Sequence, residues 1–341
     1  MALPRNSRSF STAFAGFGET VRNLLVDKPK AYVADLRVKL RDLPQTNFDL
    51  GCDFAARGLW SDAAFRFRVA IYLQPQFAQA YYNLGCCQVR LGQKSKARQS
   101  FLKTLRLVPD HAEAQFMLSA LDPAAVPVDK RPTRIPAPMV KEFFGGVAAN
   151  YDAIEASNDY QGAKVVYDAI KPLIGDRKDL VVLDIACGSG IVARPWRPLA
   201  KQLVGIELTP AMADTARLAK VADAPLFDAV LEEDALHLAE SKAPFSEADL
   251  LLVVNAAQFI GHLAPLLEML GQRMKPGALL ALTYEPFDAA AGFQVNIDTG
   301  RFGHHPHYIK QAMQHAGLQA KQENRVQLYP QFATQLLVMG K

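Results

Sequence analysis

The sequence predicts an α/β fold with a seven-stranded, doubly wound sheet, preceded by a smaller all-α domain. A strand, a glycine turn, a helix and a second strand follow one another over residues 180–207, which is typical of parallel sheets. A 34-residue repeat within residues 44–122 predicts stacked helix pairs. Between these regions, residues 122–138 contain five prolines, which neither a helix nor a central strand tolerates.

These observations predict the domain organisation. With 341 residues, the chain is long enough for two domains that each have a core. We expect an N-terminal extension at residues 1–43, repeats at residues 44–122, a semi-rigid linker at residues 123–138 and the α/β domain at residues 139–341. In the extension, the apolar spacing from Lys30 to Leu43 predicts one amphipathic helix.

The composition indicates a globular and reduced protein. Half of the residues are hydrophobic and 21% are charged, which excludes a largely disordered chain. The four cysteines show neither a metal-ligand spacing nor a disulfide pattern, so we expect free thiols, no bound metal and a cytoplasmic location. No apolar run reaches the roughly 18 residues of a membrane span, so no span is expected.

Charge is distributed unevenly along the chain. Residues 1–123 carry 17 basic and 10 acidic side chains, whereas residues 138–341 carry 18 basic and 23 acidic ones. The basic residues are dispersed and form no stripe with aromatic residues, so we expect no nucleic-acid partner. Two interpretations of the basic first half stay open: a surface for an acidic partner, or the solvated faces of helices.

The repeat is visible when residues 47–51 are aligned with residues 81–85. The same offset pairs four further positions: Gly58 with Gly92, Ala63 with Ala97, Phe67 with Phe101 and Pro75 with Pro109. This pattern resembles the tetratricopeptide repeat, whose units are antiparallel helix pairs. The apolar helix from His111 to Leu121 is expected to cap the stack. Such arrays commonly bind a peptide or a partner chain, and bracing of the neighbouring domain is the alternative.

The stretch from Leu180 to Glu207 carries the information on chemistry. Leu180 to Ile185 is a run of apolar β-formers that ends at Gly188 and Gly190, and a second such strand ends at Glu207. In units of this kind the glycines let a ligand approach the backbone, and the acid accepts hydrogen bonds from ribose hydroxyls. The stretch therefore predicts a site for a nucleoside-bearing cofactor.

The glycine pattern indicates which cofactor this is. A dinucleotide site has a third glycine for the pyrophosphate, but residues 191–193 are Ile, Val and Ala. The carboxylate of Asp184 would repel a pyrophosphate and attract an ammonium group. With Glu207 at its end, this stretch resembles motif I of the class I S-adenosylmethionine (SAM) methyltransferases, which have a Rossmann-like sheet. A structural turn without a ligand is the alternative.

The resemblance implies further cofactor contacts. Leu208 and Met212 would lie along the adenosine, and Asp234 and Ala235 would meet the adenine. Tyr151 would belong to a Phe-rich lid near the methionine end, a plain amphipathic helix being the alternative. The cofactor-binding residues expected from the motif and the resemblance are Tyr151, Asp184, Ala186, Gly188, Gly190, Glu207, Leu208, Met212, Asp234, Ala235 and Asn255.

Two features depart from the pattern of this family. Pro195 and Pro198 disturb the helix expected after motif I, which is predicted to be kinked or to begin late. The fourth strand ends at Asn255 without the prolines and the aromatic residue that grip an exocyclic amine, which disfavours methylation of a base or a glutamine amide. The last two strands, at residues 319–327 and 335–340, are expected to pair antiparallel.

Residues 300–308 contain a histidine cluster. Its Gly-Arg-aromatic-x-His segment is similar to one in bacterial proteins that join such repeats to a methyltransferase domain, a group that the chain resembles from about residue 44 onward. By this resemblance His304 is a candidate catalytic base or substrate-positioning residue. A helix-capping cluster is the alternative, and no acid completes a metal-ligand set. Arg301 is a candidate clamp for a carboxylate or a phosphate.

The sequence therefore predicts a SAM-dependent methyltransferase that acts on a small molecule or on a protein side chain. The repeats are expected to bind the substrate or a partner. The alternative is a non-catalytic adaptor whose methyltransferase fold is degenerate.

Overall fold

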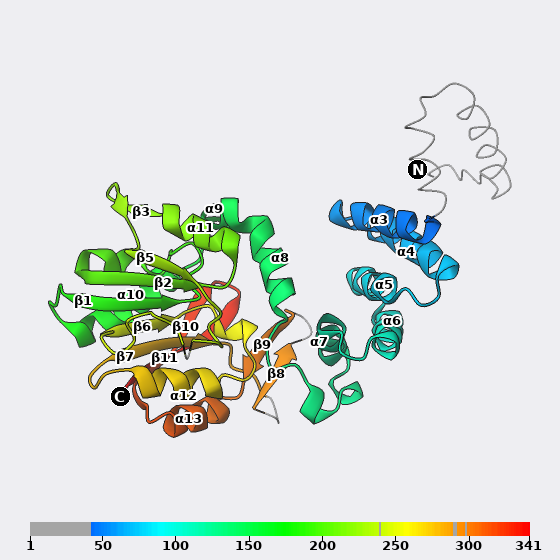
Figure 1. Cartoon of the computed structure of the whole chain (residues 1–341). Coiled ribbons are helices and arrows are strands. Elements are labelled where there is room, and N and C mark those ends of the chain that lie inside the picture. The colour runs from blue at the N-terminus through cyan, green and yellow to red at the C-terminus, as the bar shows by residue number, and fades with distance from the viewer. Residues whose placement is uncertain (1–41, 239, 289–291, 297–298) are drawn as a thin grey trace, which may run out of the picture. The chain divides into compact units, whose positions relative to one another are not determined.

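The structure is a computed structural model that describes residues 42–341, except 239, 289–291 and 297–298. The helix expected from Lys30 to Leu43 therefore lies almost entirely outside the described residues. By its contacts, the chain divides between Asp110 and His111 into two units (Figure 1).

The first unit contains the predicted helix pairs. They consist of α3 (Leu43–Ala56), α4 (Trp60–Leu73), α5 (Ala78–Arg90) and α6 (Lys94–Leu107). A Cβ atom on Gly51 would lie 2.6 Å from the ring of Phe67, and one on Gly85 would lie 2.6 Å from the ring of Phe101. Both pairs thus place a glycine where no side chain fits, which explains why these residues recur at the 34-residue offset.

The second unit is built on the predicted seven-stranded sheet, with the strand order β10-β11-β7-β6-β1-β2-β5. Its strands are β1 (Leu180–Ile185), β2 (Ala200–Glu207), β5 (Ala229–Glu232), β6 (Leu250–Val253), β7 (Leu279–Tyr284), β10 (Gln319–Tyr329) and β11 (Phe332–Gly340). The first five are parallel to one another, whereas β11 pairs antiparallel with both β7 and β10. The expected antiparallel final pair is therefore present.

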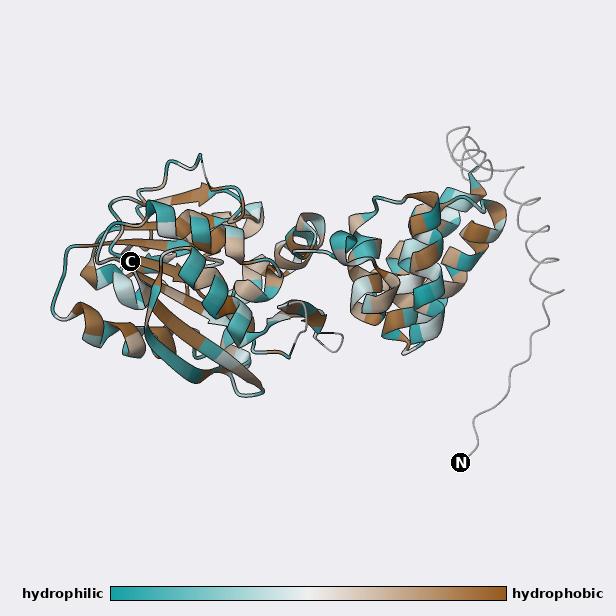
Figure 2. Cartoon of the chain, turned by 90° about the horizontal axis from the view of Figure 1, so that it is seen from below, coloured by the Kyte–Doolittle hydropathy of each residue, from teal (hydrophilic) through white to brown (hydrophobic). Residues whose placement is uncertain are grey.

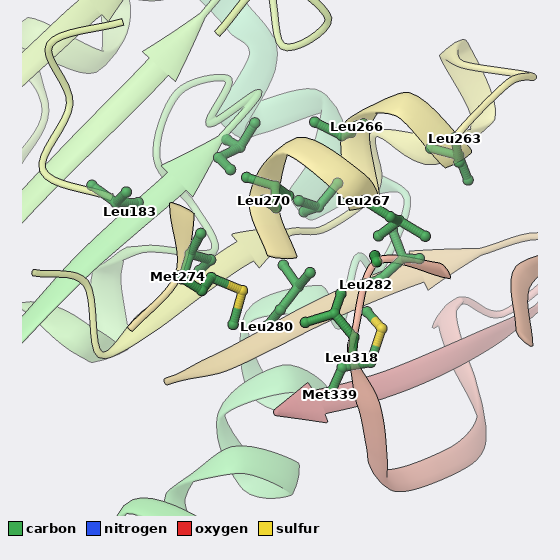
Figure 3. Packing of buried hydrophobic residues seen from close by; sticks show 14 of the residues in the cluster. Leu183, Leu263, Leu266, Leu267, Leu270, Met274, Leu280, Leu282, Leu318 and Met339 are labelled. Carbon is green, nitrogen blue, oxygen red and sulfur yellow. The ribbon is translucent and has the colours of Figure 1, made fainter. Parts of the chain in front are cut away.

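The central strands of the sheet are buried on both faces, and β1 shows this residue by residue. Val181, Leu183 and Ile185 belong to one core, and Leu180 and Val182 belong to the other. The first core also contains side chains of α12 (Ala264–Arg273) and α13 (Pro306–His315), and Figure 3 shows its packing around β7 and β11. The second contains side chains of α10 (Gly162–Ile174) and α11 (Pro210–Leu218). Figure 2 shows the hydrophobic strands between helices of mixed character.

The segment after motif I differs from an ordinary βαβ crossover. The 3-10 helix η4 (Arg194–Leu199) stands where the sequence predicts a kinked or late α-helix. Pro198 lies inside η4, and it lacks the N–H that an α-helix would need at this position. Trp196 is fully buried in the second core and packs on Tyr167, with 4.9 Å between ring centroids.

Further elements surround the sheet. They are α7 (Ala112–Leu121), η1 (Pro123–Ala125), η2 (Val128–Lys130), α8 (Ala137–Val147), η3 (Ala148–Asn150), α9 (Tyr151–Ser157), β3 (Lys220–Val221), β4 (Ala224–Pro225), η5 (Ala257–Phe259), β8 (Phe293–Asn296) and β9 (Arg301–His304). The hairpins β3–β4 and β8–β9 are not predicted from the sequence.

The helix expected as a cap on the repeats, α7, belongs to the second unit. Phe116 of α7 packs on Phe302 of β9 with 6.0 Å between ring centroids, and both side chains belong to one buried cluster. Ile135, from the proline-rich segment, joins the same cluster, and its N–H donates to the carbonyl of Phe259. The end of the proline-rich segment is therefore packed on the α/β domain.

Within the described residues, no helix combines the length and the apolar character that a bilayer crossing needs. The same residues contain no cluster of three or more His, Cys, Asp or Glu side chains that would hold a metal ion. None of the four cysteines, which all lie in the described part of the chain, forms a disulfide.

Candidate active site

The candidate site is a cavity at the carboxyl ends of β1 and β2, the position where open α/β sheets bind ligands. It measures about 950 Å³, part of which is open to solvent. The structure brings together all predicted cofactor residues except Gly190: Tyr151, Asp184, Ala186, Gly188, Glu207, Leu208, Met212, Asp234, Ala235 and Asn255. Side chains from α8 and α9 line its other side, and Figure 1 shows these helices beside α11 at one end of the sheet.

The turn after β1 carries the backbone geometry that the glycine pattern predicts. Gly188 and Gly190 have φ angles of +56° and +88°. A Cβ atom on Gly190 would lie 2.5 Å from Leu226, so this glycine packs the turn on the second core rather than lining the cavity. Ala186 also has a positive φ, +58°, a strained conformation that costs on the order of 1–3 kcal/mol. Such strain is common where a backbone is shaped for a ligand.

Glu207, at the end of β2, is fixed to this turn. Its Oε2 accepts a hydrogen bond from the N–H of Gly188 at 3.0 Å, and its Oε1 accepts one from the N–H of Thr209 at 2.8 Å. Burial raises the pKa of Glu207, and these backbone hydrogen bonds oppose the shift. Each carboxylate oxygen keeps a lone pair, so the side chain is able to accept the hydroxyl groups of a ribose.

Asp184 is a buried acid of this site with an unpaired oxygen, and Ser189 and Glu233 in the same lining also have an unpaired side-chain oxygen. Its side chain is 2% exposed, and its Oδ2 makes no hydrogen bond within the described part of the chain. Burial, with a smaller contribution from the charge of Glu207, raises its pKa to about 8. A buried carboxylate without a donor is costly, and an ammonium group would both pair with it and lower its pKa. The Asp184 carboxylate is therefore an acceptor that fits the ammonium group predicted from the sequence.

Asp234, the residue expected to meet an adenine, is already engaged. Nη1 of Arg134 lies 2.6 Å from its Oδ2, and its Oδ1 accepts a hydrogen bond from the N–H of Leu236 at 3.1 Å. Burial raises the pKa of Asp234, but the hydrogen bonds from Arg134 and Leu236 outweigh it and the net shift is downward. No local pattern in the sequence marks Arg134, because it lies in the proline-rich segment 100 residues away.

Aromatic side chains cover the cavity from the side of α8 and α9. Phe144 of α8 lies 6.0 Å from Tyr151 and 5.4 Å from Phe259, measured between ring centroids. Burial raises the pKa of Tyr151, with smaller contributions from the nearby Glu155 carboxylate. Arg194 of η4 forms an ion pair with Asp152, which ties α9 to the segment after motif I. The lid role of the Phe-rich helix stays a prediction.

A second cavity of about 730 Å³ lies next to the first. The two share four lining residues: Phe144, Tyr151, Asn255 and Phe259. The second is also lined by Glu155, Arg301 and Tyr329, none of which belongs to motif I. The structure therefore provides two adjoining compartments.

His304, the candidate catalytic residue, lines neither cavity. It is fully buried, and its Nε2 lies 2.8 Å from the carbonyl oxygen of Ile260 and 3.2 Å from that of Gly261, so Nε2 carries the proton. Burial lowers its pKa to about 4, against the effect of these two hydrogen bonds. The geometry thus gives His304 a role in holding β9 to the 260–261 loop. The neighbouring His305 caps α13, accepting a hydrogen bond from the N–H of His307.

Comparison with known families agrees with this geometry. Residues 183–280 match the methyltransferase domain family, and residues 78–111 match the tetratricopeptide repeat family. The chain therefore contains a methyltransferase domain and a tetratricopeptide repeat. The methyltransferase domain is of the class I type predicted from motif I, and its cofactor is SAM.

Individual relatives of this repeat-methyltransferase protein are distant. It is 28% identical over 144 residues to the malonyl-[acyl-carrier protein] O-methyltransferase of Pseudescherichia vulneris, a match that covers 42% of the chain and 52% of the relative. It is 35% identical over 57 residues to an uncharacterized RNA methyltransferase of Clostridium tetani, covering 17% of the chain and 12% of the relative. The chain thus spans about half the length of the first relative and much less of the second.

Among solved structures, the methyltransferase domain is similar to magnesium protoporphyrin IX methyltransferase from Synechocystis PCC 6803 with bound S-adenosylhomocysteine (SAH). The identity is 14% and the TM-score is 0.48, with 60% of this chain and 99% of that chain covered.

Proposed function

We propose that this protein binds SAM in the first cavity and transfers its methyl group to an acceptor in the adjoining compartment. The observation that carries the proposal is the unpaired Oδ2 of Asp184, in the wall of a cavity whose turn is held to Glu207. Bound SAM supplies an electrophilic methyl group on a positively charged sulfur. Transfer to a well-aligned nucleophile is accelerated mainly by holding the two reactants in line.

In this proposal each residue of the cavity has a defined task. Asp184 pairs with the amine of the methionine part, and Glu207 accepts the ribose hydroxyls. Leu208 and Met212 lie along the adenosine, and the Phe144 lid excludes water from the reacting atoms. Asp234 meets the adenine with the carboxylate lone pairs that Arg134 leaves available.

The acceptor is a small molecule or a protein side chain, and the repeats recruit it or bind a partner. Nucleic acid is not among the proposed acceptors, because the basic residues within residues 1–123 are dispersed along the sequence. The RNA methyltransferase relative covers too short a segment, 57 residues, to favour RNA. A cytoplasmic location is part of the same proposal, because the four described cysteines form no disulfide.

Calorimetric titration of the full chain with SAM and with SAH tests the proposal. The wild type should bind both, and Asp184→Ala should lose most of the affinity. Asp168→Asn, an exposed carboxylate paired with Lys164 on α10, is the matched control and should bind like the wild type. At a hundred times the dissociation constant, SAM should stabilise the fold by about 2.7 kcal/mol.

Two results separate this function from the adaptor alternative. An adaptor with a degenerate site does not need the cofactor, so absence of binding by the wild type would overturn the enzymatic proposal. Binding that Asp184→Ala retains in full would remove the observation on which the proposal rests. Binding that this variant loses would favour the enzyme.

A further inference from the structure

The second cavity is lined by a buried acid of which one carboxylate oxygen is unpaired. Glu155 of α9 is 6% exposed, and its Oε1 accepts a hydrogen bond from the hydroxyl of Tyr329 at 3.1 Å. Its Oε2 is buried and makes no hydrogen bond among the residues that the structure describes. A carboxylate oxygen withdrawn from water without a donor is costly, which points to a donor supplied by a ligand.

Hydrogen bonds connect Glu155 to Asn255, a residue that lines both compartments. The Nδ2 of Asn255 donates to the hydroxyl of Tyr329 at 3.0 Å, and that hydroxyl donates in turn to Glu155. Asn255 is one of the four residues shared by both cavities, and it has a strained positive φ of +55°. The chain of hydrogen bonds therefore holds an acid in the second cavity from a residue that also lines the cofactor cavity.

The other residues that line the second cavity indicate the polarity and charge of the rest of the ligand. Phe143, Phe144, Phe259 and Phe332 contribute aromatic surface, which favours an apolar or aromatic body. Arg301 is the other charged residue in the lining, and its Nη1 lies 3.3 Å from Oε1 of Glu285. Because that pair neutralises Arg301, the unbalanced charge in the lining is the negative one of Glu155.

We infer that the second cavity is the methyl-acceptor site and that Glu155 recognises the acceptor by accepting a hydrogen bond from its N–H or O–H group. The ligand class is a small molecule with an apolar or aromatic body that ends in an amine or a hydroxyl. An anionic end without a donor would meet the Glu155 carboxylate and be repelled. This inference rests on the proposed function, because it takes the first cavity as the place of the methyl donor.

Three probes of nearly equal size test this inference on the full chain saturated with SAH. They are 2-phenylethylamine, 2-phenylethanol and 3-phenylpropionate, and their binding is measured by ligand-observed NMR titration. We expect the amine and the alcohol to bind at least about tenfold more tightly than the carboxylate, since tenfold corresponds to one good hydrogen bond. In Glu155→Gln this discrimination should fall to less than about threefold.

Glu142→Gln, an exposed acid on α8 outside both linings, is the matched control and should keep the discrimination of the wild type. Equal binding of the three probes, tighter binding of the carboxylate, or no binding of any probe would overturn the inference. So would discrimination that Glu155→Gln retains.

Calorimetry with SAH on the same samples keeps the two hypotheses apart. SAH binding without probe discrimination would overturn the acceptor site and leave the proposed function standing. Absence of SAH binding would overturn the proposed function itself.

Discussion

Arg134 and Asp234 form an ion pair in the wall of the first cavity, with 2.6 Å between Nη1 and Oδ2. The arginine comes from the proline-rich segment, and the acid follows β5. The side chains are 24% and 18% exposed, so the pair is partly shielded from solvent. The segment that the sequence predicts as a linker thus supplies a residue to the site of the methyltransferase domain.

Replacing Arg134 by Gln should weaken this attachment. The pKa of Asp234 is lowered in the folded protein, so its pairing stabilises the fold above the unfolded pKa and is lost as the pH falls through the folded pKa. We expect Arg134→Gln to lower the free energy of unfolding by about 1 kcal/mol at pH 7 and by progressively less as the pH falls below the unfolded pKa of Asp234. Urea unfolding of both single variants and of the double variant with Asp234→Asn measures the coupling, and strictly additive effects would contradict the pairing.

The raised pKa of Asp184 predicts an opposite pH dependence. The folded protein keeps this proton between about pH 4 and pH 8 while the unfolded chain releases it, so this group lowers the stability as the pH rises through that window. The free energy of unfolding of Asp184→Asn, relative to that of the wild type, should therefore increase between pH 5 and pH 8. The increase should be up to roughly 1.4 kcal/mol per pH unit. Urea unfolding at the two pH values measures this, and a difference that does not change with pH would contradict it.

The same group should make SAM binding depend on pH. Because the amine pairs with the ionised carboxylate, the affinity of the wild type should rise between pH 6 and pH 8, with release of a proton. Titrations in buffers of different ionisation enthalpy detect that proton. Asp184→Asn should bind SAM weakly at pH 6, 7 and 8, and its binding should release no proton.

Gly188 and Gly190 should respond differently to alanine. At Gly190 the new Cβ would lie 2.5 Å from Leu226 and 2.7 Å from Phe227, so we expect a loss of stability of about 2–4 kcal/mol. At Gly188 the nearest atom is 3.5 Å away, in Met212, and only the positive φ penalises alanine, by about 1 kcal/mol. Because Gly188 faces the cavity, its variant should instead lose affinity for SAM. Unfolding and calorimetry on both variants would contradict this assignment if their effects were reversed.

His304→Asn should affect folding and leave the cofactor site intact. Burial lowers the pKa of His304 to about 4, so the unfolded chain binds more protons than the folded one between about pH 4 and 6.5. The stability contributed by His304 therefore declines as the pH falls through that range, and the variant should lack this decline. At pH 7 we expect a loss of about 1–3 kcal/mol with unchanged SAM affinity. A stable variant that forms no methylated product would instead restore the catalytic interpretation.

Local patterns predicted the parts of this protein that depend on local geometry. The apolar run from Leu180 to Ile185 reflects a strand buried on both faces, and the 34-residue offset reflects the glycine contacts with Phe67 and Phe101. Glu207 was predictable for the same reason. It is the last residue of β2, and there it accepts a hydrogen bond from the N–H of Gly188 in the turn after β1. By contrast, Pro198 indicated a disturbed helix but not the 3-10 geometry that replaces it.

The sequence by itself determined the fold class and the repeat, and it predicted residues that line one cavity, because periodicity, glycine turns and strand ends act within a few residues. The tertiary structure alone decided which distant side chains meet. Glu155 and Tyr329 are 174 positions apart, and Arg134 and Asp234 are 100 apart, so no local pattern connects them. It also decided that His304 is buried against backbone carbonyls rather than facing the cavities, since the burial of a side chain depends on the whole core around it.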